Sequence, residues 1–339
     1  MTDPHRPRLK VAIVRVSSLG DVVHNMPVVA DILRHHPNAD IDWVVEESFV
    51  DLVKLVSGVR RVIPVALRRW RHSPLSATTR AQYAAFKRTF RSERYDVIID
   101  CQGLMKTAWI ASRGLGPVVG LGNRTDGAGY EWPARYFYKR SVQIERRTHV
   151  VERSRQLVAS ALGMPAPSAD HAEIDFGLDH DAGALALAQL GLNLPVPYVV
   201  FVHASSRKDK QWPESEWIAL GEALARRGAS LVLPWGNDEE KACSQRIASH
   251  FGDAALVPPK LALDAVVGLL DGAAAVVGVD TGLVHIAAAL RRPTVELYNF
   301  STAWRTGGYW STKVVEIGAA NSPPHLSDVK QAVSRFGLL

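Results

Sequence analysis

Cysteine is almost absent from this chain, which has two in 339 residues. Cys101 and Cys243 lie far apart in the sequence and belong to no Cys-x-x-Cys or Cys/His cluster. This scarcity argues against both a disulfide framework and a structural zinc site. So low a cysteine content is typical of a protein in the reducing cytoplasm.

Long apolar runs are missing as well. No stretch of 18 or more apolar residues occurs, so we expect no membrane-spanning helix. The polar, proline-containing residues 1–10 lead into an apolar run, 11–16, that Arg15 interrupts, which is not the pattern of a secretory signal. We expect a cytoplasmic protein for which attachment to a membrane surface remains possible.

The glycine fingerprints of common nucleotide-binding loops are absent too. The first expected strand is followed by Ser17-Ser18-Leu19-Gly20-Asp21, which matches neither GxGxxG nor GxxxxGK. This absence argues against a nicotinamide dehydrogenase and against a P-loop enzyme. Internal repeats and low-complexity tracts are not apparent either, and 47% hydrophobic with 22% charged residues is ordinary for a globular protein.

What the chain does contain is an alternation of apolar runs with apolar-periodic segments. Strands are expected at residues 10–16, 41–45, 62–65, 96–100, 198–203, 231–235, 275–280 and 294–298. Helices are expected at residues 22–36, 79–91, 213–227, 238–250, 263–270, 283–290 and 326–336. This alternation indicates a parallel α/β architecture.

The length exceeds what one hydrophobic core usually supports, so we expect two domains. The Pro-rich segment 163–181 is the best candidate linker. We predict a doubly wound domain at 1–172 and a second at 173–323. The remaining residues, 324–339, are expected to form a helix that packs back on the first domain.

Positive charge is concentrated in the first half. Residues 1–175 carry 26 Lys and Arg against 18 Asp and Glu, a net of +8, whereas residues 176–339 carry 14 against 16, a net of −2. The densest basic stretches are 60–61, 68–71, 87–94, 139–140 and 146–147. An anionic partner on that side is a reasonable inference, although scattered solvated arginines explain any single cluster about as well.

Ligands of open parallel sheets bind beyond the carboxyl ends of the strands, so the residues that follow each expected strand are the ones to examine. After the first strand, Asp21 begins a helix whose free N–H groups and dipole favour an ionised carboxylate. Two interpretations stay open at this point. Asp21 is a catalytic base, or it merely caps the helix.

Three further strand ends carry polar residues. The stretch 204–210 offers Ser205, Ser206 and Lys210, which suits a phosphate, although it also reads as a polar surface loop. Glu240 suits ribose hydroxyls, yet acids also belong in a first helical turn.

The last of these strand ends begins at residue 280. The amides near Gly282 suit an anion, although capping by Asp280 or Thr281 also explains the residues there. His285, in the first turn of the helix that follows, is as often structural as it is a ligand.

Two Asp-x-Asp triplets, 40–42 and 179–181, are of the type that holds a divalent metal in many nucleotide-sugar enzymes. The first is expected to precede its strand, at the end away from the ligand edge, and the second lies in the linker. We therefore expect neither a metal nor any other cofactor.

Taken together, these segments resemble the ADP-heptose:lipopolysaccharide heptosyltransferases, and within that family the heptosyltransferase I type. The match extends over nearly the whole chain. The motifs that carry it are residues 17–24 (SSLGDVVH), 43–47 (WVVEE), 62–65 (VIPV), 68–71 (RRWR), 100–106 (DCQGLMK), 210–213 (KQWP), 233–236 (LPWG) and 279–285 (VDTGLVH). Residues 298–302 (YNFST) depart from a Gly-Pro-Thr-Asp-Pro-like stretch common in the family, which leaves the contacts of that loop open.

The resemblance implies a glycosyltransferase-B fold, two Rossmann-like domains facing a central cleft. It implies transfer of L-glycero-D-manno-heptose from ADP-heptose to the Kdo of Kdo₂-lipid A in inner-core lipopolysaccharide synthesis. By the same resemblance, Asp21 is the catalytic base. The implied donor contacts are Ser205, Ser206, Lys210, Glu240, Asp280, Thr281, Gly282 and His285. The implied acceptor contacts are Ser18, Gly20, Arg68, Arg69, Arg71 and Gln102.

Other functions remain as alternatives. Within the family, a heptosyltransferase II type would act on an already heptosylated core. Outside it, a non-catalytic module that binds anionic lipid or nucleotide would explain the N-terminal charge but not the loops of the second half. The aromatic motifs of an RNA-recognition sheet are absent, so we expect no nucleic-acid partner. The expected protein is a monomer, peripherally associated with the cytoplasmic face of the inner membrane.

Overall fold

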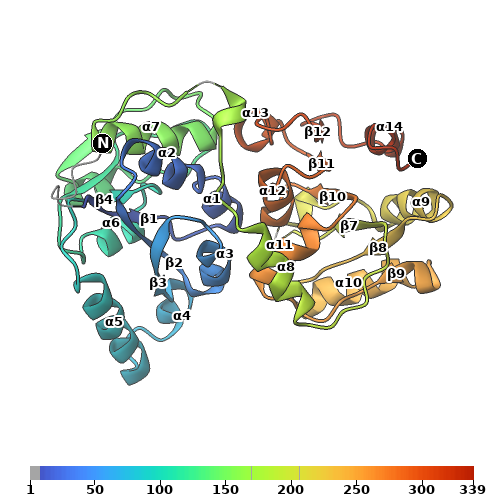
Figure 1. The fold of residues 1–339 in the computed structure, drawn as a ribbon, viewed down its shortest axis with the longest axis horizontal. Helices are drawn as coiled ribbons and strands as arrows, with labels where there is room; N and C mark the ends of the chain where they lie inside the picture. Colours follow the sequence, from blue (N-terminus) through green and yellow to red (C-terminus); the bar gives the residue numbers. More distant parts are fainter. Residues whose placement is uncertain (1–7, 169, 206) are drawn as a thin grey trace. The chain divides into compact units, whose positions relative to one another are not determined.

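The computed structural model describes residues 8–168, 170–205 and 207–339. It divides into two compact units, Met1–Gly177 and Leu178–Leu339 (Figure 1). The division falls a few residues after the expected one at 172/173. Both units are α/β, as predicted.

The first unit is built on a six-stranded parallel sheet in the order β3-β2-β1-β4-β5-β6. The central strands are buried along almost their whole length and therefore read as continuous apolar runs. The strands are β1 (Lys10–Val14), β2 (Asp40–Glu46), β3 (Val59–Val65), β4 (Val97–Asp100), β5 (Val118–Leu121) and β6 (Arg140–Val142).

Helices connect these strands. The α-helices are α1 (Leu19–Val23), α2 (Pro27–His35), α3 (Val50–Lys54), α4 (Leu67–His72), α5 (Ala77–Phe90), α6 (Met105–Ala111) and α7 (Val150–Leu162). Short 3₁₀ turns are η1 (Glu47–Phe49), η2 (Trp132–Phe137) and η3 (His171–Glu173). The single helix expected at 22–36 is wrong. Its span is divided between α1 and α2, because Pro27 has no N–H to donate and begins a new helix at its first position.

The second unit repeats the same winding. Its sheet is parallel with the order β12-β11-β10-β7-β8-β9, which is the first order again when the strands are renumbered within the unit. The strands are β7 (Tyr198–Val202), β8 (Ser230–Val232), β9 (Ala255–Leu256), β10 (Ala275–Val279), β11 (Thr294–Leu297) and β12 (Val314–Ile317). Both sheets therefore have the doubly wound order 3-2-1-4-5-6.

The helices of this unit are α8 (His180–Ala188), α9 (Glu214–Ala225), α10 (Asp238–Ala248), α11 (Leu263–Asp271), α12 (Gly282–Ala289), α13 (Ala303–Thr306) and α14 (Leu326–Ser334), with 3₁₀ turns η4 (Lys208–Lys210) and η5 (Gly252–Ala254). α14 packs on α9, β11 and β12 through Val329, Ala332 and Val333. Its apolar face completes the core of the second unit, and the expectation that this helix packs back on the first domain stays a prediction.

The segment expected to be a linker is largely ordered structure of the two units. Residues 164–168 and 170–177 are held to the first unit by contacts that include Ser57 N donating to Gly177 O at 2.7 Å. Asp179 then caps α8 by accepting from Ala182 N at 2.9 Å. The Pro-rich composition correctly indicated an irregular segment, but it did not indicate that the segment is bonded to the two units.

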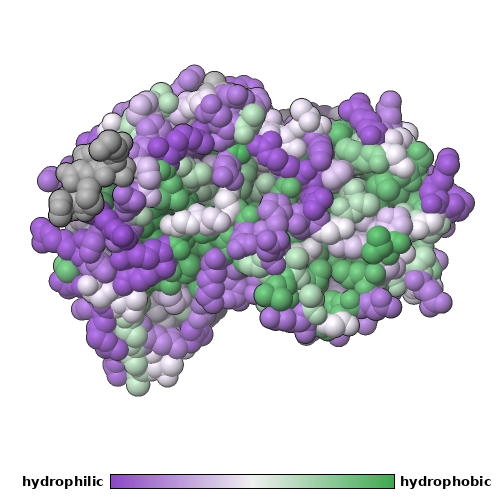
Figure 2. Space-filling view, in the orientation of Figure 1, coloured by the Kyte–Doolittle hydropathy of each residue, from purple (hydrophilic) through white to green (hydrophobic). Residues whose placement is uncertain are grey.

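No helix among the described residues is long and apolar enough to cross a membrane. On the face drawn in Figure 2, hydrophilic side chains cover most of the outer surface of the first unit.

Two glycines allow α8 and α11 to pack at close range in the second unit. A Cβ atom on Gly268 would lie 2.2 Å from Gly183 O, which is backbone and has no flexible end to move away. We predict that Gly268→Ala destabilises the protein by about 1–3 kcal/mol, the usual cost of overpacking. Urea unfolding measures it. Gly129→Ala is the matched control, because the nearest atom to its Cβ would lie at an ordinary 3.5 Å, and equal stability of the two variants would contradict this packing.

Candidate functional site

Four candidate residues of the first unit lie where the connections leaving β1 and β4 run in opposite directions, namely Ser18, Gly20, Asp21 and Gln102. β1 and β4 are neighbours in the sheet, and this switch point is where open α/β sheets leave room for a ligand. Gln102, from the loop after β4, accepts from Val16 N at 3.2 Å and Ser17 N at 3.4 Å. Its amide oxygen thereby holds the loop after β1. Gln102 was expected to contact an acceptor, and the structure shows that it also positions the loop that carries Asp21.

Asp21 stands in the first turn of α1 and is partly exposed. Its Oδ2 accepts from Ser18 N at 3.0 Å and from Ser18 Oγ at 2.9 Å, so the capping interpretation is correct as far as it goes. Its Oδ1 lies 2.6 Å from Nη2 of Arg15, and 34% of the Asp21 side chain is exposed. Helix capping alone does not require an ion pair with an arginine at a strand end. Asp21 can therefore serve both as a helix cap and as a catalytic base.

Arg15 is a residue that the sequence interpretation missed. It is buried at the end of β1, where its Nη1 donates to Cys101 O and its Nη2 meets Asp21. Burial alone would raise the pKa of Asp21, but Arg15, the Ser18 hydrogen bonds and Arg153 outweigh it and hold this pKa below its usual range. Asp21 is therefore ionised near neutral pH.

The arginines expected to face an acceptor lie on α4. Glu46, at the end of β2, accepts from Leu67 N and Arg68 N, each at 3.2 Å, and so fixes the start of this helix. The guanidinium of Arg68 lies over the Phe49 ring at 5.5 Å. Arg69, Arg68 and Arg71 are all exposed.

One of these arginines has an ionic partner of its own. Arg69 pairs with Glu47 at 2.6 Å, and about half of each side chain remains exposed. An anionic ligand at Arg69 would thus compete with Glu47.

A second basic cluster turns out to be structural. Arg60 and Arg61 both bond the buried carboxylate of Asp42, which also accepts from the Tyr95 hydroxyl at 2.7 Å. Asp42 lies near the start of β2, at the edge of the sheet away from the switch point. These two arginines therefore compensate an internal acid, and the suggestion that they attract an anionic partner is wrong.

In the second unit the equivalent switch point lies between β7 and β10, which are neighbours. Lys210, in the loop after β7, donates to both the carboxylate and the main-chain carbonyl of Asp280, directly after β10. His285 Nε2 lies 3.1 Å from Asp280 Oδ1. The structure thus brings together three of the expected donor residues, and the Asp280 carboxylate is already occupied by two of them.

A buried acid that the sequence interpretation missed completes this cluster. Glu296 on β11 is fully buried, and its Oε1 lies 3.5 Å from His285 Nδ1. The Tyr298 hydroxyl donates to the other oxygen of Glu296 at 2.9 Å. His285 therefore lies between two carboxylates, one at the ligand edge and one in the sheet.

These contacts decide the charges. Burial alone would lower the pKa of His285, but Asp280 and Glu296 raise it to about 9. Burial alone would raise the pKa of Asp280, but His285 and Lys210 hold it well below its usual range. A cationic His285 beside an ionised Asp280 is the expected state at neutral pH.

The remaining donor candidates lie at the start of α12, in the loop after β7 and in the first turn of α10. Thr281 is the N-cap of α12 and Gly282 its first residue, so the helix presents unbonded first-turn N–H groups there. Ser205 Oγ accepts from Arg207 N at 3.3 Å, and Ser206 lies outside the described residues. Glu240 accepts from Gly236 N at 2.7 Å and from the Asn237 amide at 2.8 Å, which folds the loop before α10 onto its carboxylate.

The loop whose contacts the sequence left open holds the Lys210 segment. The Asn299 amide donates to Asp209 O at 2.9 Å and to Gln211 O at 3.1 Å, on either side of Lys210. The Phe300 ring lies under the Arg207 guanidinium at 5.0 Å. This loop therefore serves to position Lys210.

Neither Asp-x-Asp pair is arranged for a metal. Asp40 and Asp42 lie inside β2 rather than before it, and Asp42 is already bonded to two arginines. Asp179 caps α8. Within the described ranges, no group of three or more His, Cys, Asp and Glu side chains is placed to hold a metal ion. Independence of a metal stays a prediction.

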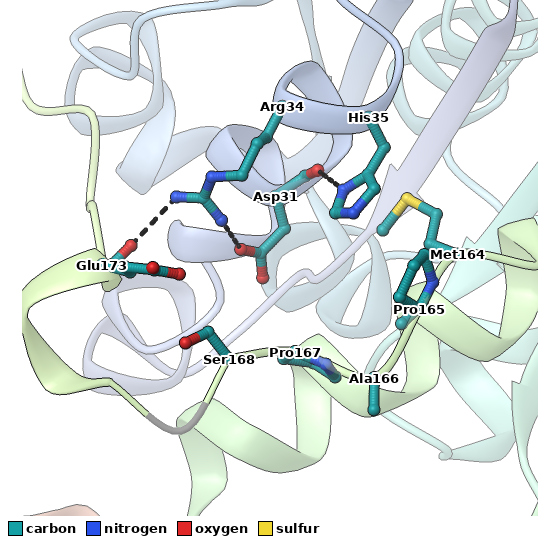
Figure 3. A pocket seen from close by; sticks show the side chains of 10 residues that line it. Asp31, Arg34, His35, Met164, Pro165, Ala166, Pro167, Ser168 and Glu173 are labelled. Atoms are coloured by element: carbon teal, nitrogen blue, oxygen red, sulfur yellow. Dashed lines mark hydrogen bonds and ion pairs between the residues drawn. The ribbon is translucent and has the colours of Figure 1, made fainter.

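A pocket of about 190 Å³ opens elsewhere on the first unit, between the ends of α2 and α7 and residues 164–173 (Figure 3). Figure 3 shows Arg34 between Asp31, at 2.9 Å, and the carbonyl of Glu173, at 3.1 Å. Asp31 also bonds the fully buried Arg155 at 2.8 Å. The pocket lies where α2 ends, at the amino edge of the sheet, so we assign it to the attachment of the 164–173 segment rather than to chemistry.

With both switch points described, the comparisons with known proteins become informative. Residues 83–333 match the family model described as glycosyltransferase family 9 (heptosyltransferase). The chain belongs to glycosyltransferase family 9. It is therefore a glycosyltransferase, and the resemblance drawn from its motifs is confirmed.

Curated members of the family cover most of the chain. Lipopolysaccharide heptosyltransferase 1 of Pseudomonas aeruginosa is 40% identical over 307 residues, which covers 90% of this chain and 83% of that protein. The protein of the same name from Escherichia coli is 39% identical over 312 residues, covering 91% and 93%.

A solved structure gives the same result. Escherichia coli heptosyltransferase WaaC with ADP superimposes with a TM-score of 0.84 at 36% identity, covering 97% of this chain and 100% of that one. The glycosyltransferase-B type of fold, with two parallel six-stranded sheets, follows from this similarity and from the topology.

The buried His285 pair predicts a pH-dependent stability. A histidine whose pKa rises from 6.5 to about 9 on folding contributes stability that is fully present below about pH 6.5 and lost as the pH rises through about 9. We therefore expect His285→Gln to be less stable than the parent by up to about 3 kcal/mol at pH 6, and by much less at pH 9.5. Urea unfolding at the two pH values measures this. His250→Gln, at an exposed position of the same unit, should leave the pH dependence unchanged, and a His285→Gln protein with the parent's pH dependence would refute the assignment.

Proposed function

We propose that this family 9 enzyme transfers L-glycero-D-manno-heptose from ADP-heptose to the Kdo of Kdo₂-lipid A, with inversion at the anomeric carbon. The observation that carries the proposal is an ionised, partly exposed carboxylate at one switch point and, at the other, a lysine held by Asp280 beside the start of α12. The type 1 reaction is supported by two relatives named heptosyltransferase 1 at 39–40% identity.

Asp21 acts as the base in this proposal. An acceptor hydroxyl gives its proton to Asp21 while its oxygen bonds to the anomeric carbon, and the bond from that carbon to the diphosphate breaks on the opposite face. Arg15 keeps Asp21 deprotonated and Ser18 fixes its orientation, so the carboxylate is ready to accept a proton at neutral pH. A single displacement of this kind inverts the configuration.

The second unit supplies the stabilisation of the leaving group. ADP departs as a diphosphate, so a cation and N–H groups suffice and no second carboxylic acid is needed to protonate it. We assign this role to Lys210, Ser205 and the start of α12 at Thr281 and Gly282. The bound ADP in the related WaaC structure supports a nucleotide site of this kind.

Three acids and a histidine take supporting roles. Asp280, bonded to Lys210 and His285, positions the lysine and lies beside the sugar, and Glu296 balances the charge of His285. Glu240 retains unused lone pairs for the ribose hydroxyls.

The acceptor is anionic, which fits the basic first unit. Arg68, Arg69 and Arg71 on α4 would meet its carboxylates and phosphates, with Ser18, Gly20 and Gln102 nearer the reacting hydroxyl. We propose a monomer that works at the cytoplasmic face of the inner membrane and needs no metal or other cofactor.

Acceptor choice tests the assignment. Purified protein is incubated with ADP-heptose and either Kdo₂-lipid A or an already heptosylated acceptor, and products are identified by mass. Transfer to Kdo₂-lipid A alone supports the type 1 reaction, and transfer to the heptosylated acceptor alone would replace it with the type 2 reaction. Donor binding with no transfer to either acceptor would leave a non-catalytic binding module.

Loss of the base should reduce turnover more than binding. We expect Asp21→Asn, which keeps the side-chain volume beside Arg15, to lower kcat by about 10²–10⁴ with nearly unchanged ADP-heptose binding, because an amide cannot accept the proton. Steady-state kinetics and donor titration check it. Asp51→Asn removes an exposed carboxylate of the same unit as a control. Near-parental turnover of Asp21→Asn would end the proposed role.

Loss of the cation should damage use of the donor. We expect Lys210→Ala to lower kcat/KM for ADP-heptose by about 10²-fold or more, since a fixed cation stabilises the diphosphate more as charge develops on it. Lys208→Ala, two residues away with an 86% exposed side chain, is the matched control. If Lys210→Ala changed only the KM for the acceptor, the assignment of the second unit to the donor would be wrong.

A further inference from the structure

One surface of the first unit exposes aromatic side chains that the proposed chemistry does not use. Trp132 and Tyr136 on η2 are 63% and 79% exposed, and their ring centroids lie 5.6 Å apart. Met105 and Trp109, at positions i and i+4 of α6, are also exposed. η2 packs against α6, so the four side chains belong to one region.

The neighbouring helix α5 extends this region. Tyr83 of α5 stacks on Trp109 with ring centroids 5.3 Å apart, and the Arg113 guanidinium lies over the same indole at 5.1 Å. We call α5, α6 and η2 together the aromatic–basic face.

The helices of this face carry only positive side-chain charge, and the nearest acid at their junction, Glu131, is used to accept from Met105 N. The sequences of α5, α6 and η2 contain no Asp or Glu. Their cations are exposed and are Arg80, Lys87, Arg88, Lys106 and Arg135. Tryptophan and tyrosine beside lysine and arginine are the residues that favour the interface between an anionic membrane and water.

The face also adjoins the candidate acceptor site. Gln102, which holds the loop of Asp21, lies three residues before the first residue of α6. Glu131, which directly precedes η2, donates its N–H to Gly103 O at 2.9 Å and accepts from Met105 N at 2.6 Å. Contacts within one unit thus connect the base to the exposed aromatics.

We infer that the aromatic–basic face docks this enzyme on an anionic lipid bilayer. Trp132, Tyr136, Met105 and Trp109 enter the interfacial region, and the five cations contact lipid phosphates. The inference rests on the proposed function, because an acceptor whose lipid part stays in the bilayer needs its sugar to reach Asp21 from an adjoining membrane-bound surface.

Vesicle binding of the full-length enzyme tests the surface itself. Sedimentation with vesicles of phosphatidylglycerol and phosphatidylethanolamine should show binding that weakens with salt, and with phosphatidylcholine vesicles it should be much weaker. We expect Trp132→Ala/Tyr136→Ala to bind the anionic vesicles about tenfold more weakly or worse. Lys106→Gln/Arg135→Gln should weaken the affinity for the anionic vesicles by about fivefold for each cation removed.

Matched controls come from the second unit. Leu185→Ala/Leu190→Ala removes exposed apolar side chains from α8 and the residues after it, and Arg226→Gln removes an exposed cation at the C-cap of α9. Both should bind vesicles like the parent. If both variants of the aromatic–basic face bound vesicles as well as the parent, the docking inference would be refuted. It would also be refuted if the protein formed an oligomer in solution that Trp132→Ala/Tyr136→Ala dissociated, because a second copy would then cover the face.

Activity assays separate this inference from the proposed function. With the acceptor embedded in vesicles, Trp132→Ala/Tyr136→Ala should lose transfer in proportion to vesicle binding, whereas with a deacylated, water-soluble acceptor it should keep the parental rate. Equal loss on both acceptors would mean that these residues act in the site rather than on the membrane. If the parent protein used neither acceptor yet bound vesicles, the proposed reaction would fail while the docking surface stood.

Discussion

The winding order 3-2-1-4-5-6 leaves one place at the carboxyl edge of each sheet where neighbouring connections run in opposite directions, and the chemistry proposed here depends on that constraint. In the first unit it lies between β1 and β4, and in the second between β7 and β10. Asp21 follows β1 and Asp280 follows β10 directly. Two acids more than 250 residues apart in the sequence thus occupy comparable topological positions, although their partners differ.

Charge compensation is what makes these positions usable. Burial without a compensating charge raises the pKa of a carboxylate and favours its protonated form. A protonated carboxyl group can neither accept a proton nor hold a cation. Arg15 prevents this at Asp21, while Lys210 and His285 prevent it at Asp280. The cluster around Asp280 includes one further charged pair, because the cationic His285 also contacts Glu296, a buried residue of the sheet.

Buried ion pairs add little to stability and are strongly destabilising when one partner is removed. Their presence at both switch points is therefore better explained by the need to keep ionised groups at a ligand edge than by folding. The same reasoning does not apply to Asp42 with Arg60 and Arg61, which lies at the opposite edge of the sheet.

The sequence predicted the parts of the fold whose cause is local. Central strands such as β1 and β7 were found because strands buried on both faces are continuous apolar runs. The edge strand β3 was found, but the edge strands β6 and β9 were not, because they have only three and two residues and too few side chains to show a pattern. The break at Pro27 could have been read from the sequence, since proline begins helices and does not continue them.

The site was predictable to the same extent. Asp280, directly after β10, and Asp21, in the first turn of the helix that follows β1, were indicated by the topology alone. Arg15 left a signal, a charge in an otherwise apolar strand, that had been used only against a signal peptide. Glu296 and Asn299 left none, because their partners, His285 and the backbone around Lys210, come from other elements and meet them only in the folded unit.

The charge asymmetry of the chain illustrates how the structure refines a composition argument. Part of the excess of cations in the first half is neutralised internally, by Asp42 for Arg60 and Arg61 and by Asp31 for Arg155. The cations that remain exposed include the arginines of α4 and those of the aromatic–basic face. The net charge of +8 therefore counts internally paired and exposed cations alike, and only the exposed ones could take part in the contacts proposed above with an acceptor and with a lipid surface.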